Sequence, residues 1–458
     1  MILKNGKIYN EGTLRKGIIL IESGIISHIR FDSQPESLEE LKRKNQDNQI
    51  IDCKNKIILP GIIDIHAHLR DMGQSYKETF QTGTKAAAYS GITTIFNMPN
   101  TVPPATSPYQ VRKWMKKAEK NIFSDVGFIA GIPPEINYDQ MKEIVELGVI
   151  GFKIYPLSPL SPIIWTDSEN IQQLLGFSSE FQKPIFIHPD WPLTHEMKEE
   201  QVDIDILKLH NKLYPPKKEA KYVNFILENY YTIISDKDLK GDKYPLVHFC
   251  HISCKDSFVL IRDALNKYPL LNISFEVTPH HLLLSNEIKL KNKNYGKVLP
   301  PLRAPEHSRF LFEQLNKNNI SLIGTDHAPH TIKEKSENYY KAPSGFPGFE
   351  TYPLMLLDKV CKYQLSLSKF VSVASENPAK RFNLKNKGFI KEGYDADLLI
   401  IDRISSYPIE ATTFYSKAKF SPFNGSYTEV QVWKVFLRGI EINKRDQEPT
   451  GRIIKKTH

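Results

Sequence analysis

Cysteine is scarce in this chain, whose 458 residues include only Cys53, Cys250, Cys254 and Cys361. Four cysteines are too few for a disulfide scaffold, and the spacing of Cys250 and Cys254 does not match a zinc knuckle. A reducing cytoplasm is therefore the compartment that we expect. The sequence also lacks any run of about 18 uninterrupted apolar residues, so we expect no membrane-spanning helix. Its N-terminal segment lacks the layout of a signal peptide.

Arginine-rich arms and basic stripes interleaved with aromatic residues are also missing, although the formal net charge is +9. Lysine and arginine are scattered along the chain, so we interpret most of this charge as solvated surface. We therefore expect neither a nucleic-acid partner nor a membrane partner. We expect one or two of the arginines to contact an anionic small-molecule ligand.

Short apolar segments that recur through the middle of the chain predict its fold. Each is followed by a stretch compatible with a helix, and such apolar runs are typical of parallel strands buried on both faces. Eight of these units in about 320 residues predict a (β/α)₈ barrel with insertions. A doubly wound open sheet is the alternative, but it would more often carry a glycine-rich phosphate loop after its first strand, and none is present. The eight segments are 62–69, 92–98, 126–132, 151–155, 185–188, 246–252, 273–277 and 322–325.

Both ends of the chain differ from the middle, because they predict short β-strands separated by turns. These strands are residues 18–21, 25–29, 56–59, 396–402 and 430–439. We expect residues 1–59 and 388–458 to build one small β-sandwich and residues 60–387 to form the barrel. The predicted fold class is therefore α/β.

A histidine pair on the first of the eight segments organises the predicted site. Side chains alternate along a strand, so Asp64, His66 and His68 share one face. Two imidazoles beside a carboxylate can bind an ion such as Zn²⁺, although two histidines on a half-buried strand would give the same pattern. The carboxyl ends of the other segments favour the metal site, because the chemistry of a barrel gathers there. They carry Lys153, Tyr155, His188, His248, His251, Glu276, His280, His281, Asp326, His327 and His330.

Seven motifs at or near these strand ends carry a resemblance to a known family. They are Asp64-Ile-His-Ala-His-Leu-Arg70, Asn97-Met-Pro-Asn-Thr101, Gly151-Phe-Lys-Ile-Tyr155, His248-Phe-Cys-His251, Glu276-Val-Thr-Pro-His-His-Leu282, Gly324-Thr-Asp-His-Ala-Pro-His330 and Gly345-Phe-Pro-Gly-Phe-Glu350. Together they resemble the amidohydrolase superfamily and, within it, the class I dihydroorotases, which also occur as a domain of the animal multifunctional pyrimidine enzyme. The resemblance covers almost the whole chain.

This resemblance implies two Zn²⁺ ions per subunit. His66, His68 and Asp326 would hold the first ion, and His188 and His251 the second. Lys153 would bridge the two as an N6-carboxylated lysine, which is a carbamate formed with CO₂. Charge favours such a bridge, because two dications repel an ammonium but attract a carbamate. In isolation, a lysine paired with a carboxylate is the alternative.

The activity implied by the resemblance is that of a dihydroorotase. A hydroxide held between the metals would attack the ring amide carbonyl of L-dihydroorotate and give N-carbamoyl-L-aspartate. Asp326 would take the proton of the hydroxide and pass it to the leaving nitrogen, as general base and then acid. The reverse cyclisation, with loss of water, belongs to pyrimidine (UMP) biosynthesis.

Substrate recognition requires a cation for the carboxylate of the substrate. Arg70 shares the inward parity of His66 and His68, and a guanidinium can bind a carboxylate through two hydrogen bonds. By resemblance, Asn100 and His330 complete this carboxylate site.

Three further residues are interpreted as hydrogen-bond partners that orient the metal ligands: Asp64, Glu276 and His281. A further ion held by Glu276 and His281 is the alternative for those two. His195 and His210 lie in a polar insertion between the fifth and sixth segments, and we expect both at the surface.

Two departures from the family pattern affect the predicted substrate site. Leu299 stands where relatives usually place an asparagine or arginine that contacts the substrate. The proline-rich segment 156–162 occupies the position of a loop that carries a substrate-binding threonine in relatives; Ser158 or Ser161 could replace it.

Two other functions compete with dihydroorotase. The first is another cyclic amidohydrolase, such as an allantoinase or a hydantoinase, which would share the metal ligands. Arg70, Asn100 and His330 favour dihydroorotase over it. The second is a non-catalytic scaffold for a transcarbamoylase, but such relatives typically lack several ligands. For the assembled protein we expect a homo-oligomer, for example a dimer.

Overall fold

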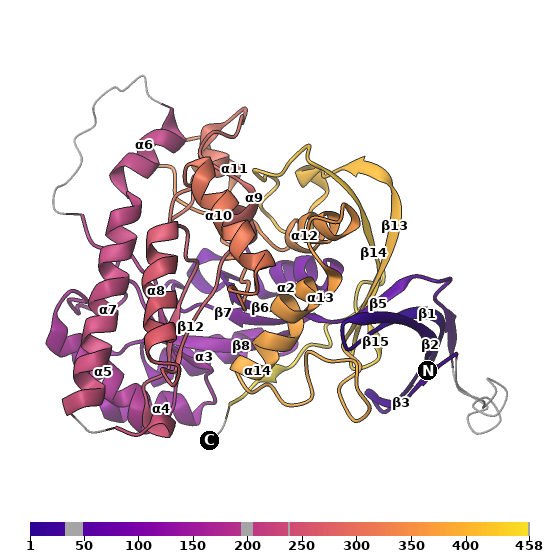
Figure 1. Cartoon of the computed structure of the whole chain (residues 1–458), viewed down its shortest axis with the longest axis horizontal. Coiled ribbons are helices and arrows are strands. Elements are labelled where there is room, and N and C mark those ends of the chain that lie inside the picture. The colour runs from indigo at the N-terminus through magenta and orange to yellow at the C-terminus, as the bar shows by residue number, and fades with distance from the viewer. Residues whose placement is uncertain (33–48, 194–204, 237–238, 457–458) are drawn as a thin grey trace.

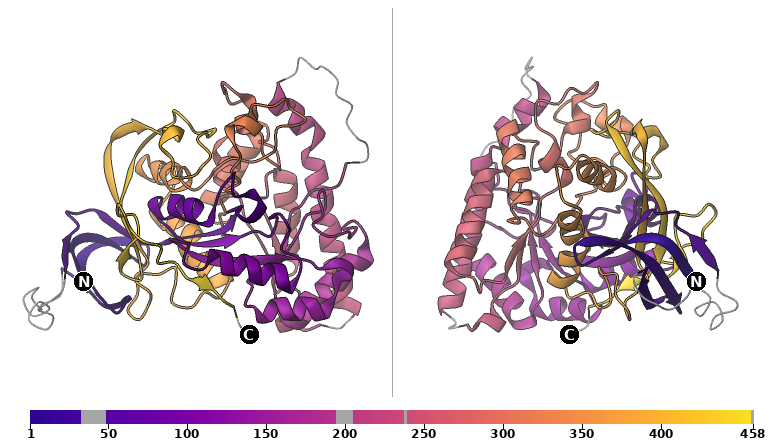
Figure 2. Two further views of the ribbon diagram at one scale, coloured as in Figure 1. Left: turned by 180° about the vertical axis from the view of Figure 1, so that it is seen from behind. Right: turned by 45° about the vertical axis from the view of Figure 1, so that its right-hand side comes forward.

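The computed structural model describes residues 1–32, 49–193, 205–236 and 239–456. Figure 1 shows a barrel of parallel strands on one side of the molecule and a second sheet, built from both ends of the chain, on the other. Figure 2 shows the same division from two further directions. None of the helices in the described ranges combines the length and the apolar character needed to cross a bilayer.

The barrel contains seven parallel strands and a closing eighth segment. In chain order the strands are β6 (Ile62–Ala67), β7 (Ile92–Asn97), β8 (Asp125–Gly131), β9 (Gly151–Ile154), β10 (Ile185–Ile187), β11 (Val247–Phe249) and β12 (Ile273–Phe275), and each pairs with the next. The eighth predicted segment and the residues just after it close the barrel through isolated bridges, Val277 to Ile323 on one side and Ala67 to His327 on the other. All eight predicted segments therefore contribute to the barrel wall.

Helices that follow the strands cover the barrel (Figure 1). They are α2 (Phe80–Tyr89), α3 (Pro108–Ala118), α4 (Tyr138–Glu146), α5 (Ser168–Phe181), α6 (Ile206–Leu213), α7 (Pro216–Asp236), α8 (Lys255–Lys267), α9 (Pro279–Leu283), α10 (Pro305–Asn316), α11 (Ile332–Lys335), α12 (Tyr352–Cys361), α13 (Leu367–Val371) and α14 (Asn377–Arg381).

Helix α3 illustrates why these segments fold as helices against the strands. The Ser107 hydroxyl caps its start by accepting a hydrogen bond from the Gln110 amide, and Pro108 occupies the first turn. Its buried side chains recur with helical spacing, which gives the helix one apolar face. Trp114 on that face packs edge-on against Phe128 of β8, with ring centroids 4.6 Å apart.

The terminal strands form one mixed sheet. It contains β1 (Ile2–Asn10), β2 (Thr13–Glu22), β3 (Ile25–Phe31), β4 (Ile50–Asp52), β5 (Ile57–Pro60), β13 (Leu398–Pro408), β14 (Tyr427–Leu437) and β15 (Ile440–Glu441). Strand β5 joins the two ends of the chain, because it pairs in parallel with β1 and antiparallel with β13. The last strand, β16 (Ile453–Ile454), returns to the barrel and pairs with β8. The predicted fold class is thus confirmed, whereas the domain boundaries at residues 59 and 387 stay a prediction.

A buried group of charges connects the terminal sheet to the barrel. Lys387 Nζ lies 2.8 Å from an oxygen of Asp125, at the start of β8, and 2.6 Å from an oxygen of Asp397, which precedes β13. Arg438, after β14, contacts the same Asp125 at 2.6 Å. The two cations hold the pKa of Asp125 below its ordinary value although burial opposes this. The resulting ion pairs fix the position of the terminal sheet relative to the barrel.

Candidate metal and substrate site

The polar strand ends meet in one cavity of about 260 Å³. Its wall comes from the segments that follow the barrel strands, as expected for the C-terminal face of a barrel. A cavity of this size fits a small molecule rather than a polymer. The lining residues are His66, His68, Arg70, Asn100, Tyr155, Leu157, Ser158, His188, His251, Val298, Leu299, Asp326, Ala328, Ser344 and Gly345.

His66, His68 and Asp326 form a tight cluster of potential metal ligands. Asp326 Oδ1 lies 3.0 Å from His68 Nε2 and 3.4 Å from His66 Nε2, and the ligand atoms of all three lie within 4.8 Å of one another. The backbone brings them together, because the Asp326 amide donates to the His66 carbonyl where the eighth segment meets β6. The sequence-predicted ligands of the first metal are thus adjacent.

Neighbouring acceptors orient both imidazoles of β6. Glu276 accepts a hydrogen bond from His66 Nδ1, and Asn100 Oδ1 accepts one from His68 Nδ1 over 2.6 Å. Each contact places a proton on Nδ1 and leaves Nε2, the nitrogen that faces Asp326, available for a cation. Asn100 therefore contacts a potential metal ligand in addition to lining the cavity.

His188 and His251 lie beside this cluster, with their ring centroids 4.5 Å apart. His188 Nε2 and His251 Nδ1 are buried and have no hydrogen-bond partner among the described residues. Lys153 lies close to both: its Nζ is 2.8 Å from the sulfur of Cys250, and its charge acts on the pKa of each imidazole. Buried nitrogens without partners are unfavourable unless something binds them, so the two histidines fit a metal ion.

The protonation states also fit a metal site. Burial, reinforced by Lys153, lowers the pKa of His188 to about 3, and burial lowers the pKa of His68 to about 4. Burial also opposes protonation of His66, but the Glu276 carboxylate outweighs it and raises the pKa of His66 to about 10. Zinc binding at His66 would therefore release its additional ring proton. Neutral imidazoles and an ionised carboxylate are the donors that Zn²⁺ prefers.

A second potential metal group shares His66. Its other members are Cys250 and Glu276, and the three ligand atoms again lie within 4.8 Å of one another. Sequence reasoning considered Cys250 only as a partner of Cys254 and did not assign it to the site. The sequence did give one indication of this role, because Cys250 directly precedes His251 in the motif His248-Phe-Cys-His251.

Lys77 determines the tautomer of His330 at the substrate side of the cavity. Lys77 Nζ lies 3.1 Å from His330 Nδ1, and because an ammonium can only donate, Nδ1 accepts. The ring proton is then on Nε2, which donates to the Ser344 carbonyl over 3.0 Å. Arg70 NH2 lies 3.2 Å from the same Nε2. Two donors face each other there, so the guanidinium of Arg70 stays available for an anion.

The turn that carries Arg70 has an unusual backbone. Arg70, Asp71 and Met72 all adopt positive φ, at 55°, 53° and 51°. Asp71 stabilises this turn, because its carboxylate accepts hydrogen bonds from the amides of Met72 and Phe80. Asp326 also has a positive φ, of 49°. Backbone strain of this kind persists mainly where the surrounding structure holds a functional side chain in place.

Asp64 and His281 were both predicted to orient the metal ligands, and their hydrogen-bond partners differ from each other. The Asp64 carboxylate accepts hydrogen bonds from the backbone amides of His66 and Thr325, so it ties β6 to the eighth segment. Both ring nitrogens of His281 are occupied, by the Thr278 hydroxyl at 2.8 Å and the Pro300 carbonyl at 3.1 Å. The neighbouring His280 instead has an Nε2 without a hydrogen-bond partner among the described residues.

The expectation that His210 lies at the surface was wrong. His210 is only 3% exposed, and its ring contacts the Tyr339 hydroxyl at 2.8 Å and the Val298 carbonyl at 2.9 Å. The polar insertion therefore packs through α6 against the segment that lines the cavity at Val298 and Leu299. His195 lies outside the described residues. Ser158 lines the cavity, as proposed for the proline-rich segment, whereas the Ser161 hydroxyl donates to the Ile132 carbonyl.

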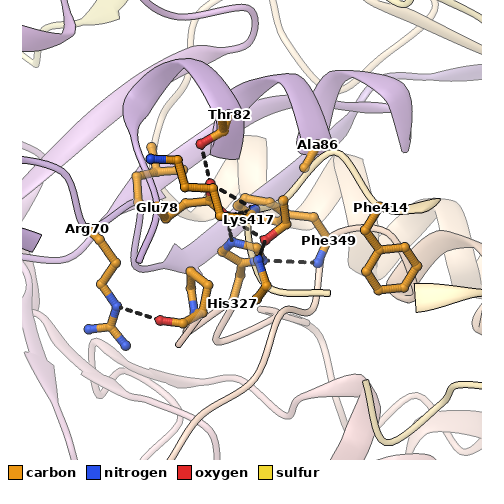
Figure 3. A network of polar contacts seen from close by, with 12 residues as sticks. Arg70, Glu78, Thr82, Ala86, His327, Phe349, Phe414 and Lys417 are labelled. Atoms are coloured by element: carbon orange, nitrogen blue, oxygen red, sulfur yellow. Dashed lines mark hydrogen bonds and ion pairs between the residues drawn. The ribbon is translucent and has the colours of Figure 1, made fainter. Parts of the chain in front are cut away.

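A polar network behind Asp326 was not found by sequence reasoning (Figure 3). His327 stacks on Phe349 with ring centroids 3.8 Å apart, and its Nδ1 accepts a hydrogen bond from the Gly348 amide. Its Nε2 faces Glu78 Oε2 at 3.8 Å, and Glu78 accepts a further hydrogen bond from the Lys417 amide. The network connects the residue after Asp326 to the start of α2 and to the C-terminal part of the chain.

Comparison with known proteins agrees with this geometry. The profile of the amidohydrolase family matches residues 57–439. A dihydroorotase from Methanosphaera stadtmanae is 34% identical over 425 residues, which cover 92% of this chain and 91% of that protein. A dihydroorotase from Pyrococcus abyssi is 34% identical over 462 residues, or 98% of each. The solved L-hydantoinase of Arthrobacter aurescens superposes with a TM-score of 0.83 at 24% identity over 99% of both chains, a likeness in fold.

The barrel and its histidine cluster define a class of protein, and the chain belongs to the amidohydrolase family. The sequence identity of 34% to two dihydroorotases, over nearly the whole chain, identifies the group within this family. Within that family the chain belongs with the dihydroorotases, which are metal-dependent amidohydrolases.

Proposed function

We propose that this chain is an active dihydroorotase that interconverts L-dihydroorotate and N-carbamoyl-L-aspartate in pyrimidine biosynthesis. One observation carries the proposal: the histidine and aspartate cluster shares its 260 Å³ cavity with Arg70, whose guanidinium is available for an anion. The cluster is suited to hydrolysis of an amide, and the guanidinium is suited to a carboxylate. Dihydroorotate has both groups, whereas hydantoin and allantoin lack the carboxylate.

Two Zn²⁺ ions are the cofactors that we propose. His66, His68 and Asp326 would hold one ion and His188 and His251 the other, with carboxylated Lys153 between them. When bound, the ions would polarise the scissile carbonyl and lower the pKa of water. The position of Lys153 supports its role, because its Nζ is buried beside Cys250 and no ion pair with a carboxylate is found for it in the described part of the chain.

Asp326 is the proposed carrier of the proton. Burial would favour its neutral form, but the electrostatic interaction with His66 opposes burial and the pKa of Asp326 is lowered, so it starts as a base. In ring opening, water adds its oxygen to the carbonyl carbon and Asp326 accepts one proton. As the carbon–nitrogen bond breaks, Asp326 delivers that proton to the leaving nitrogen.

Arg70 and His330 are proposed to bind the substrate carboxylate. Arg70 is 7% exposed and uses Nε to contact the Pro329 carbonyl at 3.3 Å, so its terminal nitrogens can address the ligand. Lys77 and Ser344 fix the ring of His330 beside it. Asn100, which lines the same cavity and contacts His68 Nδ1, completes this group.

A single assay tests the proposal. The protein is purified with Zn²⁺ and bicarbonate, its metal content is measured, and ring opening of L-dihydroorotate is compared with that of hydantoin and allantoin. We expect turnover of dihydroorotate to exceed that of both other rings by orders of magnitude. Stoichiometric metal without dihydroorotate turnover would reject the proposal, and preferred turnover of hydantoin would reassign the chain to the hydantoinases.

We also propose that the enzyme acts in the cytoplasm as a homo-oligomer, for example a dimer. Its small-molecule substrate requires no membrane contact. Light scattering of the zinc-loaded protein measures the mass of the assembly, and a monomer at micromolar concentration would contradict the proposed oligomer.

A further inference from the structure

A second cavity, of about 760 Å³, lies at the end of the barrel opposite the proposed substrate site. Its wall includes Lys183, which precedes β10, and Leu246, which precedes β11, so the cavity borders the amino ends of barrel strands. The segment after α14 and the C-terminal strand β16 supply its other sides, and Figure 1 shows the C-terminus at this end of the barrel. A cavity of this size fits a small organic molecule.

Lysine side chains give the wall of this cavity an excess of positive charge. Five lysines line it, and Glu180 is the one carboxylate among the described lining residues. Lys387 is already paired with Asp125 and Asp397. The other four lysines have no ion pair with a carboxylate in the described part of the chain: Lys183, Lys385, Lys455 and Lys456.

The cation of Lys183 is buried without an acidic partner. Lys183 is 2% exposed, and its Nζ donates to the Lys456 carbonyl at 2.7 Å and the Val149 carbonyl at 3.5 Å. Burial, reinforced by the charge of Lys456, lowers the pKa of Lys183 to about 8. A buried charge that faces only neutral groups is unfavourable, so an anion in the cavity would stabilise the folded protein.

A second cation strengthens the positive field. Arg381 of α14 donates to the Ser274 hydroxyl at 2.9 Å and to the Asn272 carbonyl at 3.1 Å, both neutral groups. Burial and the charge of Arg381 lower the pKa of Lys456. The cavity therefore has cations along its wall and a further cation behind it.

The side chain of Lys456 is free to contact a ligand. Its backbone is fixed, because the Lys456 amide donates to the Gly148 carbonyl at 2.9 Å. Its ammonium makes no hydrogen bond to other described residues, so its three N–H donors are unused within that part of the chain. Phe181, Leu384 and Ile454 add apolar surface to the same wall. The cavity thus combines donors for an anion with a surface for an organic group.

We propose that this cavity binds a small molecule that carries two or more phosphate groups, such as a nucleoside polyphosphate. Several phosphate charges match the several unpaired lysines, whereas one carboxylate would balance only one of them. The apolar part of the wall would contact the organic group of the ligand. The inference goes beyond the proposed function and does not depend on it, because the two cavities have no lining residue in common within the described ranges.

Thermal unfolding and titration calorimetry of the zinc-loaded full chain test this proposal. The probes are ATP and inorganic tripolyphosphate, each with excess Mg²⁺ to keep the phosphates from removing zinc. We expect each probe to bind saturably and to raise the melting temperature, because it binds the folded chain. Tighter binding of ATP would show that the nucleoside contacts the wall, and equal binding would show that the phosphates alone are recognised. The absence of saturable binding for both probes would overturn the proposal.

Lys456→Gln removes one unpaired ammonium and should weaken binding of both probes. We expect Kd to rise about 10- to 100-fold, the range for a lost hydrogen bond to a charged group. The melting temperature without probe and the turnover of dihydroorotate should stay at the wild-type level. Lys212→Gln is the matched control, because it removes the same charge from an exposed position on α6, away from this cavity. It should bind both probes like the wild type.

The outcomes also locate the ligand. Hydrogen exchange of the amides in residues 453–456 should slow when ATP binds, and slowing confined to the substrate cavity would overturn the proposal. Equal weakening by Lys456→Gln and Lys212→Gln would mean that the probes respond only to net charge, which overturns it as well. Should Lys456→Gln not fold, Lys385→Gln provides the same test from the other side of the cavity. A chain that binds the probes but does not open dihydroorotate contradicts the proposed function alone.

Discussion

Lys77 Nζ lies 3.1 Å from His330 Nδ1 and 2.8 Å from Glu334 Oε1, although only 8% of Lys77 is exposed. The Glu334 carboxylate pairs with the buried ammonium, and the ammonium in turn decides which nitrogen of His330 carries the proton. A residue in the loop before α2 therefore controls the hydrogen-bonding character of a group in the cavity.

Replacing Lys77 by methionine should weaken substrate binding. Without the ammonium, His330 can adopt the other tautomer and accept a hydrogen bond from Arg70, which ties up the guanidinium. We expect KM for dihydroorotate to rise about 10-fold, which corresponds to about 1.4 kcal/mol of lost binding. Steady-state kinetics at equal zinc content provide the measurement. Lys77→Arg keeps a donor and should stay closer to wild type; equal KM values for all three proteins would contradict this role.

Asp326→Asn should abolish turnover while most of the zinc remains. An amide can still offer an oxygen to a metal but cannot carry the proton, so we expect kcat to fall by about 10³-fold or more. Metal analysis by mass spectrometry and a ring-opening assay on the same sample check both parts. Substantial residual turnover would show that Asp326 serves as a ligand only.

Gly324 should tolerate no side chain, because it lies against the cluster. A Cβ atom there would be 2.6 Å from Glu276 Oε2 and 2.9 Å from His66 Cβ. Gly324→Ala should displace the carboxylate that orients His66 and weaken zinc binding about 10- to 100-fold. Zinc competition with a chelator measures this. Gly241→Ala is the control, since the nearest atom to its added Cβ is 4.0 Å away, and it should bind zinc like wild type.

Lys387→Met should destabilise the fold without a direct effect on the cavity. The variant leaves the carboxylates of Asp125 and Asp397 buried without Lys387, although Arg438 still pairs with Asp125, and the loss of one partner of a buried ion pair costs about 3–5 kcal/mol. Thermal unfolding should show a melting temperature several degrees lower. Lys385→Met, an exposed position two residues away, should change little; an equal effect of both substitutions would refute the importance of the ion pairs.

Glu350 should make the protein less stable as the pH rises. Burial raises the pKa of Glu350 to about 8, although the amides of Tyr415 and Ser416 donate to its carboxylate. An unfolded glutamate titrates near about 4.3, so the folded chain binds the additional proton between these two values. The protonated Glu350 therefore contributes its full share of folding stability below the pKa of the unfolded state, and this stability is lost as the pH rises through 8.

Glu350→Gln removes this titration. Melting temperatures measured from pH 5 to pH 9.5 should fall less steeply with pH for the variant than for the wild type, with the variant the more stable of the two at the alkaline end. Parallel curves would mean that Glu350 is already ionised in the folded protein at neutral pH.

Much of the fold follows from local patterns in the sequence. Alternation along β6 was enough to place His66 and His68 on one face, and the position of Asp326 after the eighth apolar segment was enough to bring it to them. The contacts between distant segments could not be predicted in this way. Lys77 meets His330, and Glu78 meets His327, only because the loop before α2 folds back over the barrel.

One error of prediction has a local cause. His210 was assigned to the surface because its neighbours are polar. The helix α6 nevertheless buries that one side chain against Val298.

Strand β5 pairs with both β1 and β13, so its pairing is complete only after the C-terminal strands have been synthesised. During translation β5 leaves the ribosome long before β13, so one of its edges has exposed amides and carbonyls until the C-terminal strands are made. A nascent chain that stops before β13 should therefore be prone to aggregation and to chaperone binding. Proteolysis of ribosome-stalled chains of increasing length would reveal the point at which that edge becomes protected.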